Sequence, residues 1–67
     1  MKRSLEITLR HYDAGHRVAA TGALEDAGIE VVIAQFRTIQ VRKTTPTEVR
    51  RLLKGIPIQS IGEGFRS

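Results

Sequence analysis

No cysteine occurs among the 67 residues of this chain, so no disulfide can stabilise its fold. A domain of this size buries only about 60 % of the surface that its unfolded chain exposes, which leaves it marginally stable. Many such domains need a disulfide, a metal or a second copy. The composition, 40 % hydrophobic and 27 % charged, is that of a folded domain. We therefore expect one domain, stabilised by good packing or by self-association.

The charge of the chain is positive and rests mainly on arginine. Eleven lysines and arginines oppose seven acids, for a net charge of +4, and eight of the eleven cations are arginines. Guanidinium groups bind phosphates and carboxylates through two hydrogen bonds, so this balance favours nucleic acid or an acidic protein surface as partner.

Neither a membrane segment nor a secretory signal is indicated. The longest apolar run, Val31 to Ala34, is far too short to cross a membrane. The basic residues Lys2 and Arg3 are followed by alternating apolar and polar residues rather than by a continuous apolar stretch. We therefore expect a cytoplasmic protein without membrane contact.

Segments near both ends of the chain predict strands. Apolar and polar residues alternate over residues 4–10, which indicates a strand with one buried face. A short strand is expected over residues 58–61, and glycines predict a loose tail over residues 63–67. The domain is therefore placed at residues 1–62.

The alanine-rich segment after the first strand predicts a helix over residues 14–27. Asp13 can cap its N-terminus, and Gly28 fits the left-handed position that follows a helix C-terminus. Val18 and Leu24 are the only large apolar residues available to its buried stripe. The predicted stripe is therefore thin.

Residues 30–43 are rich in residues that favour strands. Phe36 is even-numbered whereas Ile39 and Val41 are odd-numbered, so one flat strand cannot bury all three on one face. Either a hairpin turns near residues 35–38, or one long strand bulges there. No Gly, Asn, Asp or Pro marks a turn. We slightly favour the hairpin.

A second helix is predicted over residues 46–54 by the clearest local pattern in the chain. Thr45 as N-cap, Pro46 at the first helical position and Glu48 two residues later form a capping box. Gly55 then ends the helix.

The element order is therefore β-α-β-β-α-β, a split βαβ arrangement of the α+β class, with a four-stranded antiparallel sheet and two helices on one face. Without the hairpin, the order is β-α-β-α-β with a three-stranded sheet. In length and element order the chain resembles small ferredoxin-like domains, heavy-metal-associated domains included. Those metal carriers have a cysteine pair at the start of their first helix, where residues 11–16 read His-Tyr-Asp-Ala-Gly-His.

One group of residues has metal-binding chemistry. His11, Asp13 and His16 lie together between the first strand and the first helical turn, and imidazole with carboxylate can bind a divalent metal. Capping the helix is the more ordinary role of Asp13, and the sequence leaves metal binding open. No nucleophile with a base beside it and no cofactor motif is present, so we expect neither an enzyme nor a cofactor.

The basic charge is concentrated in the second half of the chain. Between residues 37 and 54, six cations meet one acid, Glu48. These cations are the candidate nucleic-acid-binding residues, namely Arg37, Arg42, Lys43, Arg50, Arg51 and Lys54. Neutralising phosphates with such residues gives salt-dependent affinity with little sequence information. Because aromatic residues are few, we expect contacts with a duplex backbone or an acidic protein.

The main hypothesis is thus a small, basic, non-enzymatic binding or regulatory module that contacts nucleic-acid phosphates through an Arg/Lys face. The alternative is self-association, as a homodimer, through a sheet edge or through the Gly and Ala face of the first helix, where Gly15 and Gly22 permit close approach. A ribbon-helix-helix repressor is a third interpretation, which requires helix over residues 31–41.

Overall fold

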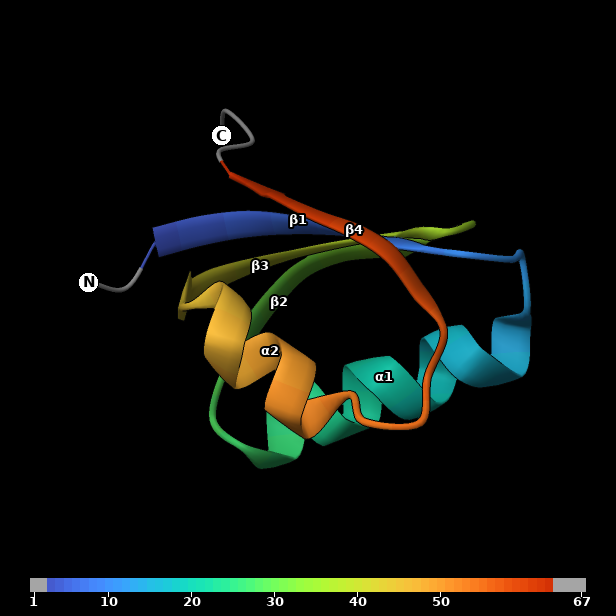
Figure 1. Ribbon diagram of the computed structural model, residues 1–67. Coiled ribbons are helices and arrows are strands. Elements are labelled where there is room, and N and C mark those ends of the chain that lie inside the picture. Colours follow the sequence, from blue (N-terminus) through green and yellow to red (C-terminus); the bar gives the residue numbers. More distant parts are fainter. Residues whose placement is uncertain (1–2, 64–67) are drawn as a thin grey trace.

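The computed structural model describes residues 3–63, which form four strands and two helices. The elements in chain order are β1 (Arg3–Leu9), α1 (Ala14–Asp26), β2 (Glu30–Gln35), β3 (Thr38–Thr44), α2 (Pro46–Leu52) and β4 (Ile58–Glu63). The strands form one antiparallel sheet in the order β2-β3-β1-β4. Both helices lie against the same face of this sheet (Figure 1). The predicted α+β split βαβ fold is confirmed, and the three-stranded sheet and the helix over residues 31–41 are wrong.

The core lies between the sheet and the helices and is aliphatic. Its buried hydrophobic residues are Leu5, Ile7, Leu9, Ala20, Leu24, Ile29, Ile39, Val41, Val49 and Leu53. The alternation predicted for the first strand places every second residue of β1 in this core. Within residues 3–63, no aromatic ring contributes to the core.

Helix α1 begins where the sequence predicts and ends at Asp26, one residue before the predicted end, with Ala27 as its C-cap. The carboxylate of Asp13 accepts a hydrogen bond from the backbone N–H of His16 at 3.0 Å, as an N-cap does. Gly28 has a φ of 82°, and the N–H of Ile29 donates to the carbonyl of Leu24 at 3.0 Å, which closes the C-terminus.

The predicted buried stripe of α1 is wrong at Val18, which is 66 % exposed. Leu24 is buried, and so is Ala20, one turn before it. Val18 precedes Leu24 by six residues, which turns it well away from that face of the helix. An apolar side chain is therefore left on the surface of α1.

The hairpin between β2 and β3 is confirmed. Gln35 pairs with Thr38, and Phe36 and Arg37 form the turn between them. A bulge is present as well, but within β2: Val31 pairs with Val41, whereas Ile33 pairs with Gln40. The hairpin and the bulge together explain why the hydrophobic phase breaks in this segment.

Helix α2 has the predicted cap but is shorter than expected. The hydroxyl of Thr45 accepts a hydrogen bond from the N–H of Glu48 at 3.2 Å, and the buried Thr44 hydroxyl donates to the Glu48 carboxylate at 2.7 Å. The helix ends at Leu52 rather than at Lys54. A turn over residues 53–55 follows it, closed by the Ile56 N–H, which donates to the Leu53 carbonyl at 3.0 Å.

Strand β4 is longer than the four residues predicted. It continues to Glu63, and Gly62 and Glu63 pair with Glu6 and Leu5. The predicted tail therefore loses its first residue to the sheet. The rest of that tail, residues 64–67, lies outside the described residues.

Candidate nucleic-acid interface

Two loops meet at one end of the sheet, where β1 leads into α1 and β2 turns into β3. The N–H of Leu9 donates to the carbonyl of Arg37 at 2.7 Å. The Arg37 guanidinium, in turn, lies with its Nη1 3.4 Å from the carbonyl oxygen of Arg10. One backbone hydrogen bond and one side-chain contact thus hold the β1–α1 loop against the β2–β3 turn.

Two exposed aromatic rings face each other across these loops. Tyr12 is 62 % exposed and Phe36 is 64 % exposed, and their ring centroids lie 6.1 Å apart with an angle of 57° between the planes. Arg17 lies beside both: its guanidinium carbon is 5.8 Å from the Tyr12 centroid, and its Nη1 donates to the Phe36 carbonyl at 3.3 Å. Arg17 therefore contacts the Tyr12 ring through a cation–π interaction and the Phe36 backbone through a hydrogen bond.

We name Arg10, Tyr12, Arg17, Phe36 and Arg37 the aromatic–arginine cluster. The acid of these loops is Asp13, whose carboxylate is engaged in capping α1. The hydrogen bond from the His16 N–H, with a smaller contribution from the nearby His16 side chain, holds the pKa of Asp13 below its ordinary value. Asp13 is therefore ionised at neutral pH, yet the three arginines outnumber it.

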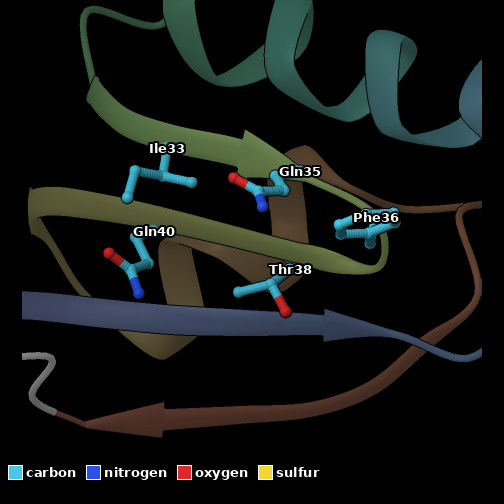
Figure 2. Close-up of a pocket in the computed structure, with 5 residues that line it drawn as sticks. All are labelled: Ile33, Gln35, Phe36, Thr38 and Gln40. Carbon is cyan, nitrogen blue, oxygen red and sulfur yellow. The ribbon is translucent and has the colours of Figure 1, made fainter.

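A depression of about 260 Å³ opens beside Phe36 on the sheet face that carries no helix. Its lining side chains are Ile33, Gln35, Phe36, Thr38 and Gln40, drawn in Figure 2. The Gln40 amide donates to the Glu6 carboxylate at 3.0 Å, which fixes its orientation. Amide and hydroxyl groups therefore lie beside an aromatic ring on an open surface.

Acids gather at the opposite end of the molecule. Because the strands are antiparallel, β2 begins and β4 ends there, at Glu30 and Glu63. Arg42 lies with its Nη1 3.8 Å from the Glu30 carboxylate, and Arg3 pairs with Glu63. None of the ion pairs formed within residues 3–63 includes an arginine of the aromatic–arginine cluster. Arg3 and Arg42 are therefore paired with acids at one end, whereas the arginines of the cluster at the other end form no ion pair within residues 3–63.

The six cations predicted as the binding site lie in three places. Arg37 is part of the aromatic–arginine cluster. Arg42 and Lys43 lie toward the other end of β3, about 15 to 20 Å away along the strand. The other three cations lie on α2 and in the turn that follows it, and all are exposed in the helical layer, namely Arg50, Arg51 and Lys54. Arg51 comes within 4.0 Å of Glu48.

Sequence reasoning missed four residues of the aromatic–arginine cluster. Arg10 ends the first predicted strand and Tyr12 follows it, and Phe36 lies at the predicted turn beside Arg37. In the predicted strand order, the end of the first strand and the following hairpin turn lie at the same end of the sheet. That topology could have brought the two arginine–aromatic segments together in advance.

The structure leaves the suggested metal group without a third ligand. Among residues 3–63, no three His, Cys, Asp or Glu side chains come together in an arrangement that could hold a metal ion. The Nδ1 of His16 lies 3.9 Å from the Asp13 carboxylate, and Asp13 is already occupied by the helix cap.

No protein-family model matches the chain, and neither does any curated protein or solved structure. Over the part of the chain that the structure describes, no helix is long and apolar enough to cross a membrane. Function must therefore be argued from the geometry and charge of the chain itself.

Proposed function

We propose that this protein is a small cytoplasmic, non-enzymatic binding or regulatory module that contacts nucleic-acid phosphates. The observation that carries the proposal is the concentration of unpaired arginines at one end of the sheet. Guanidinium groups that have no carboxylate partner are free to accept phosphate oxygens as partners. A guanidinium group that is already paired with a carboxylate, such as that of Arg42, must break this ion pair before it can bind a phosphate.

The structure changes which predicted residues are expected to contribute most. Arg37 stays at the centre of the proposed interface, joined by Arg10 and Arg17. Arg50, Arg51 and Lys54 form a second exposed basic segment in the helical layer. Lys43 is exposed near the end of β3 that is remote from the cluster, and Arg42 is paired with Glu30, so both are expected to contribute less.

Charge reversal tests the proposal and its location. One variant carries Arg10→Glu with Arg37→Glu, and the matched control carries Arg50→Glu with Arg51→Glu, which changes the net charge equally. We expect the first variant to lose binding to a fluorescent oligonucleotide at low salt, with the control losing about tenfold less affinity. A wild-type protein that binds no nucleic acid at low salt would contradict the function. If only the control lost binding to the oligonucleotide, the interface would lie on α2 instead.

Self-association is a second candidate because the two surfaces considered for it, a sheet edge and the Gly and Ala face of the first helix, lie side by side. Helix α1 lies beside the edge strand β2, and between them is a depression of about 410 Å³. Val18 and Ala34 line it, and a Cβ at Gly22 would meet no atom within 4 Å, so this glycine leaves open surface rather than a tight contact with the sheet. The surface at Gly22 is therefore open within the described chain, as the close approach of a second copy requires.

The charges along this surface are complementary to themselves. Arg17 and Glu25 lie two turns apart on α1, at either end of the depression. In a two-fold dimer with antiparallel α1 helices, Arg17 of one copy would face Glu25 of the other. Sedimentation of the wild type and of Glu25→Arg tests this: a dimer that dissociates in the variant supports it, and a wild-type monomer at high concentration excludes it.

A further inference from the structure

We infer that Tyr12 and Phe36, with the depression beside Phe36, form a site on which unpaired bases of a single-stranded nucleic acid stack. This inference rests on the proposed function, because the neighbouring arginines supply the phosphate contacts. It goes further by naming the class of nucleic acid and the groups that hold its bases.

The placement of the aromatic residues is the first argument. The chain has three, Tyr12, Phe36 and Phe65, and the core among residues 3–63 is built from aliphatic side chains only. Aromatic rings bury more surface than any other side chain, so a marginal domain gains most by placing them inside. Here the two described rings lie together and mostly in solvent instead. Stability does not explain that arrangement, whereas contact with a partner does.

The backbone of Phe36 is the second argument. Its φ of 55° lies in the left-handed region, which is rare and strained for a bulky residue. Phe36 is the first residue of a two-residue hairpin turn, and Arg37 does not share the positive φ. Glycine is favoured at this position when only the first turn residue has positive φ. A strained phenylalanine here projects a ring from the tip of the hairpin, and such strain concentrates at binding sites.

Arg17 prepares the rings for a ligand. Its hydrogen bond to the Phe36 carbonyl fixes the strained residue, and its guanidinium covers part of Tyr12. The rings are tilted by 57°, so neither stacks flat on the other, and both remain largely exposed. A base can therefore stack on an aromatic face without first separating the pair.

The depression supplies the polar groups that a base edge requires. Figure 2 shows Thr38 and the Gln35 amide nearest to Phe36, with Gln40 farther along β3, so Gln35 and Thr38 are the groups that a base stacked at Phe36 would meet. Its volume of about 260 Å³ is below that of most sites for drug-sized ligands, and suits a single flat group. The three arginines of the aromatic–arginine cluster lie around the β1–α1 loop and the β2–β3 turn, outside the lining of the depression, and match a backbone with one negative charge per nucleotide.

A single strand fits these features better than a duplex, although the sequence alone favours duplex backbone. Bases in a duplex are already stacked and paired, so their faces are closed to protein rings. Exposed aromatic residues next to basic side chains are the arrangement with which proteins bind single strands with little sequence preference.

Tyrosine fluorescence gives a direct test, because Tyr12 is the only tyrosine and the chain has no tryptophan. The probes are an oligothymidylate of about eight nucleotides, an abasic deoxyribose-phosphate strand of the same length, and a duplex. We expect the oligothymidylate to quench Tyr12 emission and to bind about 5- to 150-fold more tightly than the abasic strand. We expect no quenching by the abasic strand or the duplex.

Variants separate stacking from phosphate contact. Phe36→Ala is expected to remove most of the preference for oligothymidylate over the abasic strand, while Phe36→Tyr retains it. Val32→Ala is the matched control, because Val32 is an exposed apolar residue that lines neither depression, and this variant is expected to change nothing. Circular dichroism of each variant verifies the fold.

The two proposals fail in different ways. If the wild type binds both strands equally and Phe36→Ala changes neither affinity, stacking is overturned while phosphate binding stands. If no probe binds at low salt, both fall together. If a polyglutamate peptide binds as tightly as oligothymidylate and quenches Tyr12 equally, the site recognises an acidic protein, and the inference is overturned.

Discussion

At the scale of single residues, Phe36 is expected to lower the stability of the fold and to strengthen binding of a partner. Its φ of 55° is favourable for glycine and strained for phenylalanine, and its exposed ring contributes little burial. We expect Phe36→Gly to raise the free energy of unfolding by about 1 kcal/mol, and to weaken oligothymidylate binding. Urea denaturation and fluorescence titration measure the two effects. Arg37→Gly is the control and should not stabilise, because Arg37 has no positive φ. A destabilised Phe36→Gly would show that the ring serves packing.

The same residue shows why the sequence alone could not define the site. The hairpin was only slightly favoured because its turn contains none of the residues that normally mark one. A strained backbone at a phenylalanine cannot be deduced from residue type, since the preference of the residue is the opposite. The prediction for Val18 is wrong for a related reason. A large apolar residue in a helix predicts burial, and only the packed structure shows that Ala20, rather than Val18, lies in the core.

At the scale of elements, the helix termini were the most predictable part of the chain. Asp13, Gly28 and Thr45 act as their types predict, because capping depends on a few neighbouring residues. The ends of β4 and α2 were less predictable, since strand length depends on a partner strand that is distant in sequence. The sequence did not predict the aromatic–arginine cluster for the same reason, because its two segments lie about 20 residues apart in the chain.

Helix α1 is expected to weaken in acid because its cap is a carboxylate. The folded state holds the pKa of Asp13 below the value of the unfolded chain, chiefly through the His16 N–H. The cap therefore contributes its full stability above the unfolded pKa, and loses it as the pH falls below about 4. We expect the His16 amide resonance to titrate there, with faster hydrogen exchange in the first turn of α1. In Asp13→Asn this titration should vanish. Its persistence would assign the transition to another group.

At the scale of the whole molecule, charge is distributed unevenly between the two ends of the sheet. Among the described elements, β2 and β4 carry their terminal acids at the end where Arg3 and Arg42 find partners. The other end presents the arginines of the two loops. An anionic strand is therefore attracted more strongly to the end with unpaired arginines than to the end where arginines and acids are paired, which orients it before contact.

The salt dependence of binding measures how many cations of the protein contact phosphates of the strand. For single strands, each neutralised phosphate contributes about 0.7 to the slope of log affinity against log salt concentration. Contacts confined to Arg10, Arg17 and Arg37 therefore predict a slope of about −2. If the exposed cations of the α2 segment also engaged phosphates, the slope would approach −4. A fluorescence titration with oligothymidylate over a salt series distinguishes these values, and the slope of the Arg10→Glu, Arg37→Glu variant should fall toward zero. A steep slope that this variant leaves unchanged would place the phosphate contacts on α2, and a flat slope in the wild type would contradict phosphate binding altogether.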